Sequence, residues 1–214
     1  MKCNWILSCT DYFIERINGL STFGTSIDDI NHGYWLYQPT PYLILQKIFC
    51  KYKFKQTDSF IDIGCGAGRV LCVAAMCGCK HVAGIEIDCD LVIKCLGNLK
   101  KCAKKKDFSY HIYNDTYQRF KLFDQYNNYF LFNPFSIKHF VRFVRLLLVK
   151  TEQIRLFLYC PPDEYINYLK HTGLFRLVDV LFFDKANPFH ATYIYEKKAE
   201  TRLTTYEAAS MAEE

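Results

Sequence analysis

The chain has 214 residues, of which 50% are hydrophobic and 23% charged, enough to bury the core of one globular α/β domain. A formal net charge of +5 permits a nucleic-acid partner without requiring one. No apolar run reaches the length of a membrane span, and the N-terminus lacks the apolar core of a secretory signal. The 11 cysteines therefore predict reduced thiols in the cytoplasm, and their spacing does not indicate a metal site.

Residues 1–38 are predicted to form an N-terminal extension. Apolar side chains at helical spacing indicate a helix that ends near Leu20, and a loop-like stretch follows. Pro39 and Pro41 stiffen the aromatic segment after it, because their rings fix the backbone. Pro41 can begin a helix, which is predicted over residues 42–49.

The stretch Ser59–Asp88 predicts a buried strand, a glycine turn, a helix and a second buried strand. Gly64, Gly66 and Gly68 occupy alternate positions, so the backbone can turn sharply and approach a ligand closely. The helix that follows offers free N–H groups to an anionic group. The second strand leads to Glu86, about 20 residues on, where a carboxylate can bind two ribose hydroxyls.

The rest of the chain continues the alternation of helices and strands. Helices are predicted over 90–106, 137–149 and 163–171, and strands over 108–113, 128–132, 154–159, 174–183 and 191–195. Lysines on one face of the helix 90–106 indicate a solvated surface more than a phosphate-binding one. The last two strands are joined by too few residues for a crossover helix, which predicts an antiparallel pair. Residues 198–214 form a polar tail.

The glycine turn carries the resemblance to a known family. Arg69 stands where a dinucleotide fingerprint requires its third glycine, so the NAD pattern fails. The acidic-x-Gly-x-Gly-x-Gly spacing of Asp62–Gly68 resembles motif I of the class I S-adenosylmethionine (SAM) dependent methyltransferases. The resemblance covers residues 39–197 and implies a Rossmann-like α/β fold: a seven-stranded, mostly parallel, doubly wound sheet with an antiparallel last strand. It also implies a SAM site formed by Tyr37, Thr40, Asp62, Gly64, Cys65, Gly66, Gly68, Glu86, Ile87 and Asp115.

Some of these residues have particular roles in the resembling family. There the acid at the position of Asp62 lies near the methionine amino group, and the acid at Glu86 holds the ribose. An acid at the position of Asp115 commonly bonds the adenine amino group in that family. The alternative for Asp115 is a turn-forming role. Tyr37 and Thr40 belong to a segment that resembles a lid over the cofactor, and the alternative is that the tyrosines pack on the sheet.

Asn133, Pro134 and Phe135 follow the fourth predicted strand and resemble motif IV of the amino methyltransferases. In that family the Asn oxygen and the Pro carbonyl accept hydrogens from an NH₂ group, and an aromatic ring stacks on a planar acceptor or contacts a cation. Ser136 replaces the usual second aromatic residue, which disfavours a flipped nucleobase. The alternative for Asn133 is to cap the next helix, with Pro134 at its first position.

These patterns predict a SAM-dependent methyltransferase that acts on an amine or amide nitrogen and releases S-adenosylhomocysteine (SAH). A small molecule or a protein side chain is favoured as the acceptor over nucleic acid, and no membrane or metal is expected. An RNA methyltransferase, an O- or C-methyltransferase and a non-catalytic binding module with this fold are the alternatives.

Overall fold

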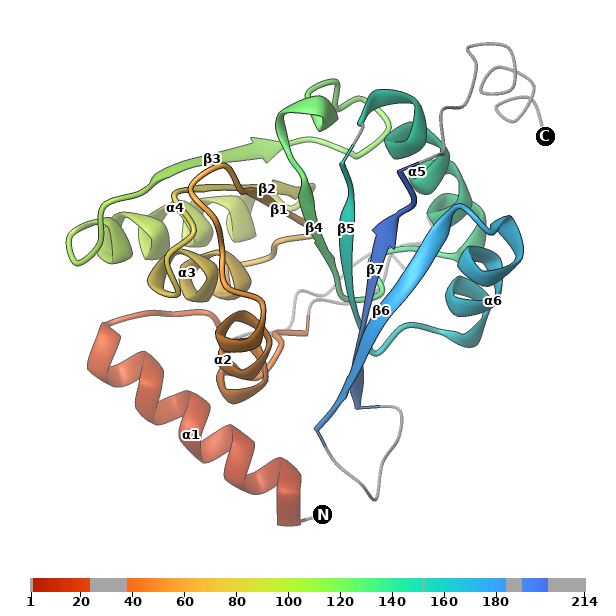
Figure 1. Cartoon of the computed structure of the whole chain (residues 1–214). Helices are drawn as coiled ribbons and strands as arrows, with labels where there is room; N and C mark the ends of the chain where they lie inside the picture. Colours follow the sequence, from red (N-terminus) through yellow and green to blue (C-terminus); the bar gives the residue numbers. More distant parts are fainter. Residues whose placement is uncertain (1, 24–37, 152, 184–189, 200–214) are drawn as a thin grey trace. The chain divides into compact units, whose positions relative to one another are not determined.

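The computed structural model describes residues 2–23, 38–151, 153–183 and 190–199 (Figure 1). In chain order its elements are α1 (Lys2–Asn18), α2 (Tyr42–Lys51), β1 (Ser59–Ile63), α3 (Arg69–Met76), β2 (His81–Glu86), α4 (Cys89–Ala103), β3 (Ser109–Asn114), the 3₁₀ helix η2 (Phe123–Gln125), β4 (Asn128–Leu131), α5 (Ile137–Lys150), β5 (Arg155–Tyr159), α6 (Asp163–Thr172), β6 (Phe175–Phe182) and β7 (Ala191–Lys197). The predicted helices and strands are confirmed, and among the described residues only η2 was not foreseen.

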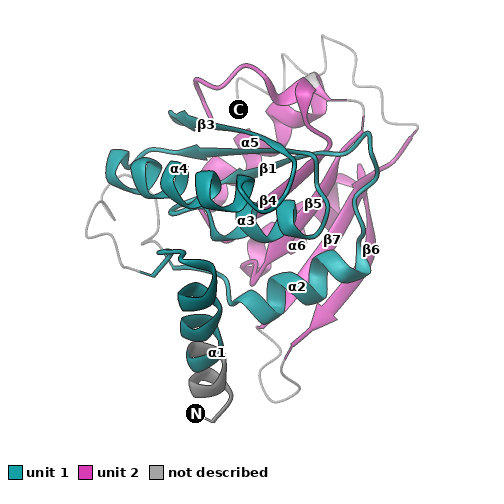
Figure 2. Cartoon of the chain, turned by 90° about the vertical axis from the view of Figure 1, so that its left-hand side faces the viewer, with its two compact units in different colours: residues 1–28, 36–116 teal, residues 29–35, 117–214 magenta. Residues whose placement is uncertain are grey.

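The chain divides into two compact units (Figure 2). Unit 1 comprises residues 1–28 and 36–116, and unit 2 comprises residues 29–35 and 117–214. Unit 1 therefore contains α1 to α4 and β1 to β3, and unit 2 contains η2, β4 to β7, α5 and α6.

Unit 1 contains three parallel strands in the order β3-β2-β1. β1 and β2 are buried along almost their whole length, as expected of strands covered on both faces, whereas β3 is partly exposed. Helix α3 begins directly after the glycine turn and ends at Met76, and Gly78 follows it with φ 103°. This arrangement brings the ends of β1 and β2 and the start of α3 together.

Unit 2 contains four strands in the order β4-β5-β7-β6. β4 and β5 are parallel, and β7 is antiparallel to both β5 and β6. A stacked ring pair, Phe140 of α5 and Tyr165 of α6 with centroids 3.6 Å apart, joins the two helices of this unit. The fold class is thus the predicted one: seven strands in a mostly parallel sheet, with β7 antiparallel.

Among the described residues, no helix is both long enough and apolar enough to cross a bilayer. Among the residues whose side chains are described, ten cysteines have free thiols, and no three or more His, Cys, Asp or Glu side chains are arranged to hold a metal ion.

Candidate functional site

The turn between β1 and α3 has the backbone that its glycines predict. Gly64, Gly66 and Gly68 all have positive φ, at 80°, 52° and 81°, a region that L-residues with a Cβ rarely adopt. The amides of Gly64 and Cys65 both donate to the carbonyl of Ile85 in β2, at 2.9 and 3.0 Å. The predicted sharp turn is confirmed, and these bonds hold it against the end of β2.

Two thiols fill the space behind this turn. A Cβ placed on Gly68 would lie 2.5 Å from Cys95 Sγ, and one on Gly84 would lie 2.7 Å from Cys65 Cβ. A hydrogen bond with Cys95, together with burial, raises the pKa of the Cys65 thiol well above its usual value. Cys65 was predicted to bind the cofactor, and its buried, neutral side chain leaves the backbone as the part that can do so.

Glu86 binds backbone amides of the turn and of the segment that follows β2. Its carboxylate accepts from the amide of Gly66 at 2.8 Å and from those of Ile87 and Asp88 at 2.8 and 3.0 Å. Burial raises the pKa of Glu86, and the three N–H groups oppose that rise. An ionised carboxylate offers about four acceptor positions, so one remains for a further donor such as a hydroxyl.

Asp62 lies near the end of β1 and is only 3% exposed. Burial, and next the negative charge of Glu86, raise the pKa of Asp62 well above its usual value. A bound cation would favour the ionised form of this carboxyl, because it would offset both effects. Ile87 contributes its amide to Glu86, while its side chain is exposed.

The end of β3 adds a residue that the sequence did not single out. The side-chain amide of Asn114 donates to the carbonyls of Glu86 and Ile87, both at 3.0 Å, and so fixes the backbone on either side of the acid. Asp115 accepts from the amide of Thr116 at 2.7 Å, a local bond of the kind its alternative turn-forming role implies. The signal that could have identified Asn114 was its position at the end of the strand beside Glu86.

The predicted lid residues have different outcomes. Tyr37 lies outside the described residues. Thr40 is 2% exposed, and its carbonyl accepts from the guanidinium of Arg69 at 3.3 Å. The described part of this segment thus contacts the residue that follows the glycine turn.

In unit 2, Asn133 combines an unusual backbone with a fixed side chain. Asn133 and Cys160, which follow β4 and β5, both have positive φ, at 43° and 46°. The Asn133 amide donates from Nδ2 to the carbonyl of Cys160 at 2.6 Å, and this bond fixes which atom is the oxygen. Oδ1 of Asn133 is buried and has no hydrogen-bond partner among the described residues. Such an acceptor is rare in a folded protein and is suited to a donor from a ligand.

One role considered for Phe135 is wrong. The ring is 3% exposed and packs against Tyr117 and Phe143, with centroids 4.7 and 5.7 Å apart, and the Phe135 carbonyl accepts from Tyr165 Oη at 2.5 Å. Core packing uses this ring, so it cannot stack on an acceptor in this conformation.

The capping alternative for Asn133 is also wrong. Helix α5 has its N-cap at Ser136, so neither Asn133 nor Pro134 belongs to its first turn. The left-handed backbone of Asn133 therefore needs another explanation than the start of a helix.

Two sequence comparisons find likeness to proteins named for methylation. A family model described as "Histone methylation protein DOT1" matches residues 34–120. A protein-lysine N-methyltransferase from Saccharolobus islandicus is 33% identical over 66 residues. That match covers 30% of this chain and 41% of the relative, so the chain spans about two fifths of the relative's length.

Solved structures extend the likeness to most of the chain. A proposed RNA methyltransferase from Pyrococcus horikoshii aligns with a TM-score of 0.62 and 16% identity over 90% of this chain and 98% of its own. This chain has the Rossmann-like methyltransferase fold. An RNA methyltransferase from Salinibacter ruber in complex with SAH (TM-score 0.57, 16% identity, 78% of this chain and 97% of its own) has a similar fold. The magnesium protoporphyrin IX methyltransferase of Synechocystis with bound SAM is similar too (TM-score 0.56, 14% identity, 72% and 77%).

Proposed function

We propose that this chain is a SAM-dependent methyltransferase. The observation that carries the proposal is the Gly64–Gly68 turn, whose central amide is bound by Glu86 while that carboxylate keeps an acceptor position for a hydroxyl. Two structures of the same fold hold SAH and SAM, and the DOT1 model covers both the turn and Glu86. These similarities support SAM as the cofactor.

The residues of unit 1 fit the parts of this cofactor. SAM would supply a methyl group already activated on a sulfonium. Asp62 would face the cationic methionine end, Glu86 would accept from a ribose hydroxyl, and Asp115 would accept from the adenine amino group. The backbone of Cys65 and Ile87 would border the site. Tyr37 and Thr40 complete the proposed set.

The proposed acceptor is an amine or amide nitrogen of a protein side chain or a small molecule. Oδ1 of Asn133 supports this proposal, because a buried acceptor without a partner can take a hydrogen from an NH₂ group. The protein-lysine N-methyltransferase relative favours a protein side chain. Asn133 and the carbonyl of Pro134 would orient the nitrogen lone pair, and their dipoles would stabilise the positive charge that develops on nitrogen.

Calorimetric titration with SAM and SAH tests the cofactor. We expect binding by the wild type and loss of binding in Asp62→Ala and Glu86→Ala variants that retain the circular dichroism spectrum. Absence of binding, or binding that both variants retain, would refute the proposal.

Labelled SAM with a cell extract tests the acceptor. Label that protease removes from the macromolecular fraction indicates a protein, label that ribonuclease removes indicates RNA, and label in the small-molecule fraction indicates a metabolite. An RNA product would favour the alternative that the RNA methyltransferase structures represent.

A further inference from the structure

Arg69 is the first residue of α3 and directly follows Gly68 of the glycine turn. It is 2% exposed, which is rare for an arginine. A guanidinium carries five N–H donors and a permanent charge, so it can be buried only where both find partners. The partners of Arg69 therefore show what holds this end of the turn.

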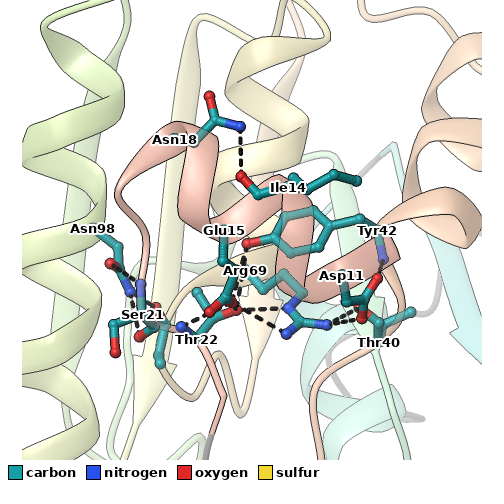
Figure 3. A network of polar contacts seen from close by, with 11 residues as sticks. Asp11, Ile14, Glu15, Asn18, Ser21, Thr22, Thr40, Tyr42, Arg69 and Asn98 are labelled. Carbon is teal, nitrogen blue, oxygen red and sulfur yellow. Dashed lines mark hydrogen bonds and ion pairs between the residues drawn. The ribbon is translucent and has the colours of Figure 1, made fainter. Parts of the chain in front are cut away.

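These partners come from the N-terminal part of unit 1 (Figure 3). They are the carboxylates of Asp11 and Glu15 on α1, the hydroxyl of Thr22 at 2.6 Å, the carbonyl of Thr40 at 3.3 Å, and the rings of Phe23 and Tyr42 at 4.8 and 4.5 Å from the guanidinium carbon. Glu15 also accepts from the amide of Thr22 at 2.9 Å. One arginine thus joins α1, the segment after it and the start of α2 to the start of α3.

Asn98 of α4 forms a second link to the same turn. Its Nδ2 donates to the carbonyls of Ala67 and Ser21, both at 2.9 Å, and its Oδ1 accepts from the amide of Ser21 at 3.0 Å (Figure 3). Asn98 is 2% exposed. A single buried amide therefore ties the turn residue Ala67 to the chain just after α1.

We propose that residues 11–22 hold the glycine turn in the conformation that binds the adenosyl cofactor, with Arg69 and Asn98 as the positioning residues. This inference rests on the proposed function. Glycine populates positive and negative φ almost equally, so a turn with three glycines is ordered by the contacts around it. Asp11, Glu15, Arg69 and Asn98 are at most 6% exposed, so they act on the cofactor through the turn and not by contact.

The polar nature of the link supports a positioning role. A buried ion pair adds little net stability, because desolvation of the two charges offsets their attraction. Apolar side chains could attach α1 as firmly. The planar fork of the Arg69 guanidinium, however, bonds in fixed directions and so selects one arrangement of α1 and α3.

Two variants test the proposal in the full chain. Asn98→Leu keeps the branched shape of the side chain and removes the bonds to Ala67 and Ser21. Arg69→Lys keeps the charge and removes the fork. We expect amide exchange of residues 64–69 in the unliganded protein to become faster, and the Kd for SAH, measured well below the Tm, to rise about tenfold, the factor for one lost buried hydrogen bond.

Leu99→Ala is the matched control. Leu99 is a fully buried neighbour on α4 that takes no part in these hydrogen bonds. The cavity should lower the Tm, while exchange at residues 64–69 and the Kd for SAH stay as in the wild type.

Unchanged exchange at the turn in both variants would overturn the proposal, and so would faster exchange with an unchanged Kd. If the wild type binds no SAH, the proposed function fails and so does the cofactor part of this inference. The exchange data then show separately whether Asn98 and Arg69 order the turn.

Discussion

Replacement of Glu86 by glutamine gives the sharpest test of the cofactor site. The substitution keeps the shape of the side chain and removes its charge. The carboxylate accepts from the amides of Gly66, Ile87 and Asp88 at 2.8 to 3.0 Å. A glutamine has one oxygen, so its NH₂ group must face either the amide of Gly66 or the amides of Ile87 and Asp88, and it disturbs the carboxylate's contacts in both orientations.

The structure sets the size of the effect. Hydrogen bonds to a charged group each contribute about 1.5–3 kcal/mol, so loss of one corresponds to about 10- to 150-fold weaker binding. Burial disfavours the charged form of Glu86 and raises its pKa. Removal of the charge also removes this cost of desolvation. The substitution should therefore lower the free energy of unfolding by less than it weakens the free energy of SAH binding.

Titration calorimetry with SAH and thermal unfolding without ligand measure the two quantities. Asp107→Asn is the control, because it removes the same charge from a side chain that is 99% exposed and pairs with Lys80 at the surface. A Glu86→Gln variant with the Kd of the wild type would show that the carboxylate is structural and would refute the ribose assignment.

Four further outcomes follow from the structure. The Kd for SAM should rise by about tenfold for each pH unit below the raised pKa of Asp62, because the cation binds the ionised carboxyl, which must first release its proton at such a pH. Calorimetry across pH measures this profile, and Asp62→Asn should flatten it. Conversely, the unliganded protein should lose stability as the pH rises through that pKa, since its folded state holds the proton more tightly than the unfolded chain. Gly68→Ala should lower the free energy of unfolding by about 1–3 kcal/mol in denaturant titrations, because the φ of 81° is left-handed and the added Cβ would meet Cys95. The control is Gly97→Ala on α4, where no atom lies near the added Cβ, and this variant should be about 0.5–1 kcal/mol more stable than the wild type. Asn133→Ala should lower kcat about 100-fold and leave the Kd for SAM unchanged, and full turnover of the variant in a labelled-SAM assay would point to an oxygen or carbon target.

The sequence predicts well those features that local rules determine. Gly64, Gly66 and Gly68 were expected to permit a sharp turn after a buried strand, and all three have positive φ. The antiparallel end of the sheet followed from the short connection before β7, which no crossover helix fits. In both cases a few consecutive residues are sufficient for the prediction, because the constraint on the backbone is steric.

Features that depend on packing could not be predicted in the same way. The Asn-Pro-Phe pattern is compatible with an exposed or a buried ring, and the ring of Phe135 is buried because Tyr117 and Phe143 surround it. The capping role considered for Asn133 fails for a similar reason: its side chain bonds to the carbonyl of Cys160, just after β5, and Ser136 is the N-cap of α5. These outcomes depend on contacts with residues 8, 18 and 27 positions away in the chain, which local patterns do not contain.

Arg69 shows how far such a dependence reaches. In the sequence it served only to exclude the dinucleotide fingerprint, because an arginine stands where a glycine is required. In the folded chain this side chain is buried between two carboxylates that lie 54 and 58 residues earlier. A glycine at this position would leave Asp11 and Glu15 buried without the guanidinium, and the burial that already raises the pKa of Asp11 would then be opposed only by the amide of Tyr42. The arginine after the turn and the two acids of α1 therefore depend on each other, and α1 is better understood as part of the unit that contains the glycine turn than as an appendage to it.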